Sequence, residues 1–249
     1  GKRQTGSAFK PFVLAAALEQ GYTLDTMWDA SPFETPVKDE IWHVENYENA
    51  ITGGSYTLEM ATVWSINTVY ARLITAVGAD KVVDVAHRMG ITSQIDPDPA
   101  IALGGLARGV SPLEMASAFG TIANGGMAVA PSGVDRVTDA EGTLVYAPNR
   151  AGTEAISADV AKTLAYVLNE VYTSGTGQAA NFGAWGAVKT GTAQSWRDAW
   201  VVGWSGDLST AVWVGYPQAQ VAMENVHGIR VTGGSFPAEV WPAFVLVAS

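Results

Sequence analysis

Along the first two thirds of the chain, apolar residues recur three and four positions apart, the spacing at which side chains share one face of a helix. This pattern predicts helices over residues 7–20, 57–75, 80–89 and 157–172. The first predicted helix ends at Gly21, a residue type that often follows the last turn of a helix. The sequence Ser-Pro-Leu-Glu at 111–114 is a capping box with proline at the first helical position, so another helix is expected from there to about Asn124.

Two stretches of the chain lack helical periodicity. Residues 22–56 hold prolines and a glycine pair among scattered aromatic residues, and are expected to form a long irregular connection. Residues 129–146 alternate around the turn sequence Asp-Ala-Glu-Gly at 139–142, which predicts a peripheral β-hairpin.

The pattern changes in the last third of the chain. Short runs rich in Val and Trp at 187–193, 199–205 and 210–216 are separated by turn residues and predict three successive antiparallel strands. A closing helix is expected at about 236–248. The predicted fold class is therefore α+β in a single domain over residues 1–249: a helical part at about 7–175, including an all-helical subdomain, an antiparallel sheet at about 187–216, and the C-terminal helix.

Composition narrows the possible functions. The chain has 249 residues with 48% apolar and 15% charged residues, and its 14 Lys and Arg against 24 Asp and Glu give a net charge of -10. Such an acidic domain without a basic run is a poor nucleic-acid surface, so no nucleic-acid partner is expected. The absence of cysteine excludes disulfides, thiolate metal sites and thiol nucleophiles. The three histidines lack metal-ligand spacing, so neither a metal nor another cofactor is expected.

The first chemical motif is Ser7-Ala8-Phe9-Lys10, which opens the first predicted helix. A spacing of three places Ser7 and Lys10 on one helical face. A serine hydroxyl needs a neighbouring base to act as a nucleophile, and lysine can be that base once burial lowers its pKa. Taken alone the motif is weak, because a Ser-x-x-Lys match is common by chance.

Two further motifs follow along the chain. Ser65-Ile66-Asn67 lies inside the predicted helix 57–75, and Lys189-Thr190-Gly191-Thr192 lies on the first predicted strand. Lys-Thr-Gly arises by chance in roughly one such chain in twenty. Glycine weakens a strand, so Gly191 is expected to mark the close approach of a ligand backbone.

Together the three motifs, in this order on helix, helix and strand, resemble the penicillin-recognising serine acyl-transferases. The wider sequence resembles the transpeptidase domain of bifunctional (class A) penicillin-binding proteins over essentially the whole chain. This wider resemblance rests on the segments at 3–12, 102–105, 109–116, 189–193, 198–200, 211–216 and 232–238.

The resemblance implies a peptidoglycan D,D-transpeptidase that is acylated by β-lactams. In that scheme Ser7 is the nucleophile and Lys10 its base. Ser65 relays a proton to the leaving amine, Asn67 holds the substrate backbone and Lys189 supplies positive potential. Thr190, Gly191 and Thr192 form the strand segment that binds substrate, with the two threonines on its carboxylate, and the N–H groups of Ser7 and Thr192 form an oxyanion hole.

The resemblance also sets expectations about the parent protein and its partners. The expected partners are peptidoglycan stem peptides, as a D-Ala-D-Ala donor and an amine acceptor, and β-lactams. The family's transpeptidase domain has strands before the nucleophile helix; only six residues precede Ser7 here, so those strands are expected to be missing from this chain. The expected parent protein is membrane-anchored, carries a glycosyltransferase domain and works extracytoplasmically, on the outer face of the cell membrane.

Three alternative functions use the same serine and lysine. A D,D-carboxypeptidase would pass the acyl group to water, and a sensor would be acylated by β-lactams without transpeptidation. A β-lactamase of class A would need a glutamate to activate water, and no Glu occurs between Asn67 and Glu114, where the family pattern would place it.

Overall fold

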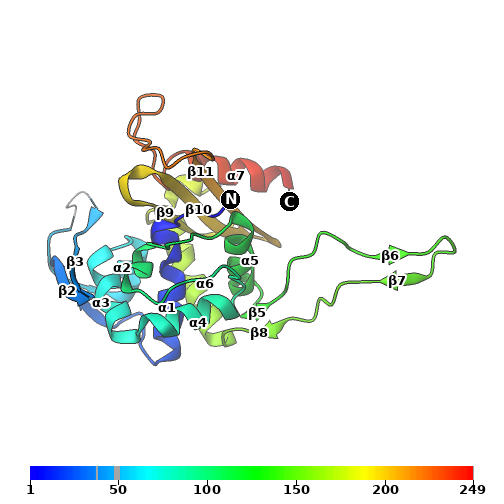
Figure 1. The fold of residues 1–249 in the computed structure, drawn as a ribbon, viewed down its shortest axis with the longest axis horizontal. Coiled ribbons are helices and arrows are strands. Elements are labelled where there is room, and N and C mark those ends of the chain that lie inside the picture. Colours follow the sequence, from blue (N-terminus) through cyan, green and yellow to red (C-terminus); the bar gives the residue numbers. More distant parts are fainter. Residues whose placement is uncertain (38, 48–50, 249) are drawn as a thin grey trace.

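In the computed structural model, which describes residues 1–37, 39–47 and 51–248, a three-stranded antiparallel sheet lies between a C-terminal helix and a larger body of helices (Figure 1). The strands are β9 (Ala187–Thr192), β10 (Asp198–Ser205) and β11 (Leu208–Gly215), in the order β11-β10-β9. All residues of β10 are buried, because α5 (Pro112–Ala123) and α7 (Phe236–Ala248) both pack against it. The expected α+β class and three strands are confirmed.

The helical body is built around α1 (Lys10–Glu19), which packs against α3 (Asn67–Val77), α4 (Ala79–Arg88) and α6 (Ala158–Thr173). A 3-10 turn, η1 (Gly6–Phe9), leads directly into α1 and is buried beside β9. The remaining helical segments in the described residues are α2 (Leu58–Val63), η3 (Pro99–Leu103), η4 (Gln178–Ala180) and η5 (Gln194–Trp196).

The capping box predicted at the start of α5 is present. Ser111 Oγ accepts the Glu114 N–H, and the Glu114 carboxylate accepts the Ser111 N–H at 2.8 Å. The same carboxylate accepts hydrogen bonds from the N–H and hydroxyl groups of Thr92 and Ser93. These bonds hold the pKa of Glu114 at about 2 although burial opposes them, so this carboxylate is ionised across the physiological range.

The expectation of an irregular connection over 22–56 is wrong for much of that stretch. Strands β2 (Phe33–Val37) and β3 (Glu40–Val44) form an antiparallel hairpin, and β1 (Met27–Asp29) pairs with β4 (Ser55–Thr57). Half-buried and exposed residues alternate along β2, but apolar and polar residue types do not, so the sequence gives no clear signal for this strand. Residues 38 and 48–50 of this stretch lie outside the described residues.

The predicted helix over 57–75 is two helices, α2 and α3, separated by Trp64, Ser65 and Ile66. Ser65 has a φ of 57° and thereby ends the helical path, because an L-residue with positive φ cannot continue a right-handed helix. The break turns the chain between α2 and α3 and places Ser65 in a loop.

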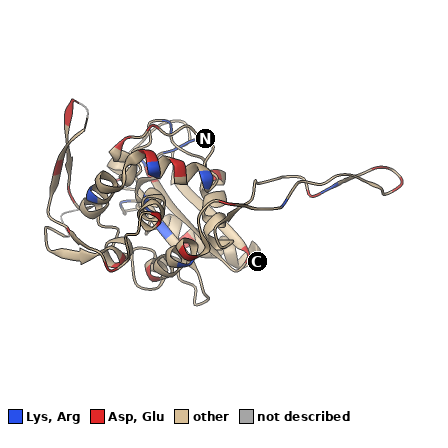
Figure 2. Ribbon diagram, turned by 90° about the horizontal axis from the view of Figure 1, so that it is seen from below, with Lys and Arg blue, Asp and Glu red and all other residues tan. Residues whose placement is uncertain are grey.

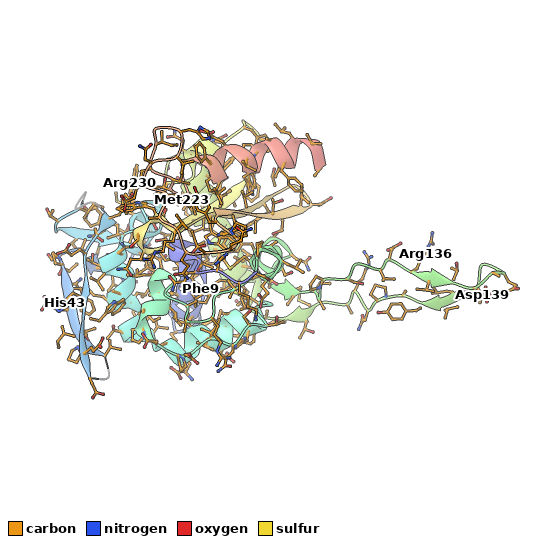
Figure 3. All side chains as sticks on the ribbon, turned by 45° about the horizontal axis from the view of Figure 1, so that its top comes forward. Phe9, His43, Arg136, Asp139, Met223 and Arg230 are labelled. Carbon is orange, nitrogen blue, oxygen red and sulfur yellow. The ribbon has the colours of Figure 1, made fainter. Side chains whose placement is uncertain are left out.

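The peripheral hairpin predicted around residues 139–142 is confirmed. Strands β6 (Val137–Thr138) and β7 (Leu144–Tyr146) project away from the body, joined to it through the paired strands β5 (Met127–Ala128) and β8 (Thr153–Glu154) (Figure 1). Arg136 and Asp139 lie far from the central Phe9 (Figure 3), and every residue of β6 and β7 is exposed.

The closing helix is also confirmed, and α7 runs through Pro242 without a break. Its Trp241 is fully buried and donates from Nε1 to the Thr210 carbonyl of β11. In the part of the chain that the structure describes, none of the helices has the length and apolar character needed to traverse a bilayer.

Candidate active site

Ser7 lies in η1, the turn that leads from the N-terminal segment into α1. Gly6 has a φ of 54°, and a Cβ at this position would collide with the backbone carbonyl of Thr192 on β9. Glycine is therefore needed for the backbone of Ser7 to lie beside β9. The Ser7 side chain is half-buried, and in the described part of the chain its hydroxyl makes no hydrogen bond.

Lys10 occupies the first turn of α1 and its side chain has no solvent exposure. Its Nζ donates to Ser65 O at 2.6 Å, to Asn67 Oδ1 at 2.8 Å and to Ser65 Oγ at 3.1 Å. Burial, and after it the charge of Lys189, holds the pKa of Lys10 well below its ordinary value. Lys10 therefore has access to the neutral form that a proton acceptor needs.

Ser65 joins the two lysines of the site. Lys189 Nζ donates to Ser65 Oγ at 2.9 Å and to the Thr190 carbonyl at 3.0 Å. Lys189 has no solvent exposure, and burial lowers its pKa to about 7. The Ser65 hydroxyl oxygen thus accepts from the Nζ atoms of both Lys10 and Lys189, and positive φ at Ser65 places it there.

Asn67 begins α3 and bridges two parts of the site. Its Oδ1 accepts from Lys10, and its Nδ2 donates to the Glu45 carbonyl at 3.3 Å, in the segment that follows β3. The amide remains half-buried. Asn67 therefore fixes the orientation of the Lys10 ammonium group and lies at the edge of the buried lysine pair.

Thr190 and Thr192 present their hydroxyl groups to loops that close over β9. The Thr190 and Thr176 hydroxyl oxygens are 2.7 Å apart, and Thr192 Oγ1 accepts the Gly233 N–H at 3.0 Å. Thr192 is half-exposed and keeps its hydroxyl proton available for another acceptor. The two hydroxyl groups thus line the strand that also carries Lys189.

The Thr192 N–H group points away from the neighbouring strand β10. Thr192 lies opposite Ala199, and in the next residue pair along the ladder the Ala193 N–H donates to the Asp198 carbonyl at 2.8 Å. Hydrogen-bonded and non-bonded pairs alternate in an antiparallel ladder, so the Thr192 N–H is directed outward from β10. Among the described strands β9 pairs only with β10, so this N–H group faces the side of β9 on which Ser7 lies.

Gly191 is explained differently from the sequence-based expectation. A Cβ at this position would collide with the Thr5 carbonyl and come within 2.8 Å of the Ala8 nitrogen. The close approach that requires glycine is therefore made by the chain's own η1 segment, and the expectation of a ligand backbone there is wrong. Gly191 allows the nucleophile segment to lie directly against β9.

All the residues predicted for the site therefore lie on four adjoining segments: η1 with α1, the loop before α3, the start of α3, and β9. Sequence reasoning did not single out Tyr70, whose ring lies 5.1 Å from Lys10 Nζ, and it noted Gly233 only as part of the segment 232–238, with no role in the site. The helical spacing of three between Asn67 and Tyr70 is the signal that could have found the tyrosine. Gly233 is joined to Thr192 only through the fold.

The site concentrates positive charge in an acidic protein. Figure 2 shows Lys and Arg scattered among more numerous Asp and Glu over helices and loops. Lys10 and Lys189, by contrast, are buried side by side with hydroxyl, amide and carbonyl oxygens as partners. Among the described residues no group of three His, Asp or Glu could hold a metal ion. The arrangement is suited to activating a hydroxyl group and to attracting an anionic ligand.

Comparison with known proteins identifies the family. Residues 1–225 match the family model of the penicillin binding protein transpeptidase domain. The chain is 33% identical to penicillin-binding protein 1A of Mycobacterium tuberculosis over 96% of its own length and 31% of that protein. It is 34% identical to penicillin-binding protein 4 of Bacillus subtilis over 91% of its length and 36% of that protein. It therefore spans about a third of the length of these relatives.

Solved structures agree with the sequence comparison. The penicillin-binding protein PonA1 of Mycobacterium tuberculosis superposes with a TM-score of 0.87 at 31% identity, covering 98% of this chain and 68% of that one. The same protein in complex with penicillin V gives a TM-score of 0.86. The chain belongs to the penicillin-binding protein transpeptidase family, and within it the chain is similar to the transpeptidase domain of the bifunctional (class A) proteins.

Proposed function

We propose that this domain is a peptidoglycan D,D-transpeptidase. The observation that carries the proposal is the meeting of Lys10 Nζ, Lys189 Nζ and Ser65 Oγ, with Lys10 three residues along the chain from the half-buried Ser7. Two buried lysines with lowered pKa values give one neutral amine to accept a proton and one ammonium group to attract a carboxylate.

In the first half of the reaction, Ser7 Oγ attacks the carbonyl carbon of the penultimate D-Ala of a stem peptide, and Lys10 takes the hydroxyl proton. The tetrahedral oxyanion accepts from the N–H groups of Ser7 and Thr192. When the peptide bond breaks, Ser65 passes a proton to the leaving nitrogen, and terminal D-Ala departs with a neutral amine. Asn67 holds the amide backbone of the stem peptide during this step.

In the second half, an amino group of a neighbouring stem peptide attacks the ester carbonyl of the acyl-enzyme. The attacking amine loses its proton to the Lys10–Ser65 pair, and Ser7 recovers a proton as its ester bond breaks. Lys189, Thr190 and Thr192 bind the terminal carboxylate of the donor in the first half. A β-lactam mimics that donor: its ring opens on attack by Ser7, and the leaving nitrogen stays attached to the adduct.

The same proposal covers the location of the domain and the longer protein to which it belongs. Stem peptides are extracytoplasmic substrates, so the domain works on the outer face of the cell membrane. The parent protein is membrane-anchored and carries a glycosyltransferase domain outside this chain. A D,D-carboxypeptidase or an acylated sensor would use the same Ser7 and Lys10.

Intact-mass spectrometry of the chain with benzylpenicillin over several hours tests the nucleophile. One stable adduct on the peptide that contains Ser7 is expected, and Ser7→Ala should show none while Ser132→Ala in the exposed connection is labelled normally. Mixing the domain with a D-Ala-D-Ala stem peptide and an amine acceptor then tests the reaction. Cross-linked product with release of D-Ala supports a transpeptidase, release without cross-linking indicates a carboxypeptidase, and neither product indicates a sensor.

A further inference from the structure

Arg3, four residues before Ser7, contacts Asp198 at the start of β10, Trp213 on β11 and the two residues that follow β11. Its Nη2 donates to the Tyr216 carbonyl at 3.0 Å and to the Pro217 carbonyl. Its guanidinium carbon lies 5.1 Å from the centre of the Trp213 ring. Figure 1 shows the N-terminus beside β10 and β11, so this segment lies along the sheet from the start of the chain.

The carboxylate that faces Arg3 belongs to Asp198, the first residue of β10. Arg3 Nε lies 3.9 Å from Asp198 Oδ1, and the same oxygen accepts the Trp213 Nε1–H at 2.9 Å. The Asp198 side chain is 4% exposed, and burial raises its pKa against the opposing effects of Trp213 and Arg3. A buried carboxylate of this kind depends on its donors, so the positions of Arg3, Asp198 and Trp213 are coupled.

Asp198 connects this cluster to the end of β9. Its backbone carbonyl accepts the N–H of Ala193, the residue that follows Thr192. Asp198 therefore touches Arg3 through its side chain and fixes the strand end beyond Thr192 through its backbone. One residue thus joins the segment before Ser7 to the segment that carries the outward Thr192 N–H.

The backbone of the same segment is held at each step towards Ser7. Arg3 exchanges both backbone hydrogen bonds with Val110 at 2.9 Å, and the Gln4 carbonyl accepts Trp200 Nε1 at 2.8 Å. Thr5 and Gly6 then lie against Gly191 and Thr192. These contacts hold every residue from Arg3 to Gly6 in place. A displacement of Arg3 would therefore displace the backbone of Ser7 as well.

We propose that Arg3 is a positioning residue that, through Asp198 and Trp213, fixes Ser7 relative to the Thr192 N–H group. The proposal rests on the function proposed above, in which Ser7 is the nucleophile. Arginine is required because a planar guanidinium group can stack on Trp213 while it donates to two carbonyls. A lysine ammonium group at this position would keep the charge and lose both the stack and the paired donors.

The chain offers a matched control for this test in Arg72 on α3. Arg72 Nη1 donates to the Ser31 carbonyl at 2.9 Å, Nη2 to Asp29 Oδ2 at 2.9 Å, and its guanidinium carbon lies 4.5 Å from the Phe33 ring centre. The Arg72 side chain is 19% exposed and that of Arg3 is 16% exposed. The two arginines have similar partners, but Arg72 holds the start of the β2–β3 hairpin.

The experiment compares Arg3→Lys with Arg72→Lys by three measurements: the second-order rate constant for acylation by a fluorescent penicillin, the midpoint of thermal unfolding, and amide hydrogen exchange over residues 4–9. Arg3→Lys should acylate about 10- to 100-fold more slowly, because a displacement of about 1 Å at the reacting atoms costs up to that factor. Exchange over 4–9 should rise. Arg72→Lys should lower the unfolding midpoint by a similar amount and acylate at the wild-type rate.

Acylation by Arg3→Lys at the wild-type rate would overturn the proposal, and so would an equal loss in Arg72→Lys, which would mark a merely structural effect. If the wild-type chain were not acylated at all, the proposed nucleophile would fail, and hydrogen exchange would still decide whether Arg3 orders residues 4–9. If Arg3→Lys does not fold, Trp213→Leu removes the stacking surface and the Asp198 donor, and the same rate and exchange effects are expected from it.

Discussion

Ser65 Oγ accepts a hydrogen bond from Lys189 Nζ at 2.9 Å, which joins a loop between two helices to the middle of a β-strand. Lys10 reaches the same oxygen at 3.1 Å. The contact depends on the Ser65 backbone, whose φ is 57°, a conformation that residues other than glycine rarely adopt. The conformation that places the Ser65 hydroxyl group between two lysines therefore carries local backbone strain.

Two substitutions of Ser65 distinguish the effect of its hydroxyl group on acylation from the effect of its backbone strain on stability. We predict that Ser65→Ala and Ser65→Gly both slow acylation about tenfold or more, because each removes the proton relay. We expect Ser65→Gly to be more stable than Ser65→Ala by about 1 kcal/mol, because glycine adopts positive φ without steric cost. Urea unfolding and acylation kinetics measure the two effects. Equal stability of the two variants would contradict the strain at this position.

Removing Lys10 should affect chemistry more than folding. Lys10→Ala is expected to slow acylation about 10²-fold or more, since in the proposed mechanism Lys10 is the proton acceptor of Ser7. The exposed Lys81→Ala on α4 serves as the control and should acylate normally. Stopped-flow or gel-based labelling with a fluorescent penicillin gives the rates, and circular dichroism reports the fold. A normal rate in Lys10→Ala would assign the base to another group.

The pH dependence of acylation follows from the two lysines. Lys10 accepts a proton only when neutral, so the rate should rise with pH and reach its plateau below the ordinary lysine pKa, because the pKa of Lys10 is lowered. Lys189 loses its charge above a pKa of about 7, so affinity for a carboxylate-bearing β-lactam should weaken above that pH. Rate constants and affinities measured from about pH 5 to about pH 10 test both directions. A rate that rises only near the ordinary lysine pKa would contradict this assignment.

The Thr192 hydroxyl group offers a test of carboxylate recognition. Thr192→Val should weaken binding of a carboxylate-bearing β-lactam about 10- to 100-fold, the usual cost of losing a hydrogen bond to a charged group. Thr192→Ser keeps the hydroxyl and should bind nearly as well as the wild type. Thr173→Val, on the exposed end of α6, controls for the loss of a threonine hydroxyl elsewhere. Equal binding by the Val and Ser variants would remove Thr192 from the carboxylate site.

Glu114 predicts a pH-dependent stability that is independent of the active site. Its folded pKa of about 2 lies below the unfolded value of 4.5, so its contribution is present above pH 4.5 and is lost as pH falls towards 2. Glu114→Gln should therefore lower the free energy of unfolding by about 1–3 kcal/mol at neutral pH, and by less in acid. Glu141→Gln in the exposed hairpin is the control. Urea unfolding at both pH values measures the difference, and a cost independent of pH would contradict the assignment.

Local sequence signals predicted much of the fold because they act within a few residues. The capping box at Ser111, the Val- and Trp-rich strands and the turn of the peripheral hairpin each depend on near neighbours. The break at Ser65 was not predictable, since a positive φ at a serine has no local sequence signal and its hydroxyl partners, Lys10 and Lys189, lie on distant segments. The close approach at Gly191 was anticipated, but its cause was misassigned because the sequence does not show that η1 packs there.

The motifs at Ser7, Ser65 and Lys189 predicted which segments would meet, and these segments lie together in the fold. Two partners that close the site were not predicted, the Gly233 N–H for Thr192 and the Tyr70 ring for Lys10. Tyr70 belongs to no motif, and the segment 232–238 was noted only for its family resemblance. Backbone donors and ring faces can belong to almost any residue, so only the folded chain identifies them.

The backbone contacts of the nucleophile segment also constrain how the protein folds. Residues 5–8 touch Gly104 in the middle of the chain and Gly191 near its end, with no side chains between them. Both contacts close long loops, and long loop closures belong to the slow steps of folding. We therefore expect helices α1 and α3 to form early and Ser7 to reach its place only after the sheet has assembled. On that expectation, reactivity at Ser7 comes late in the folding of this chain, and β-lactam acylation would report the completion of folding.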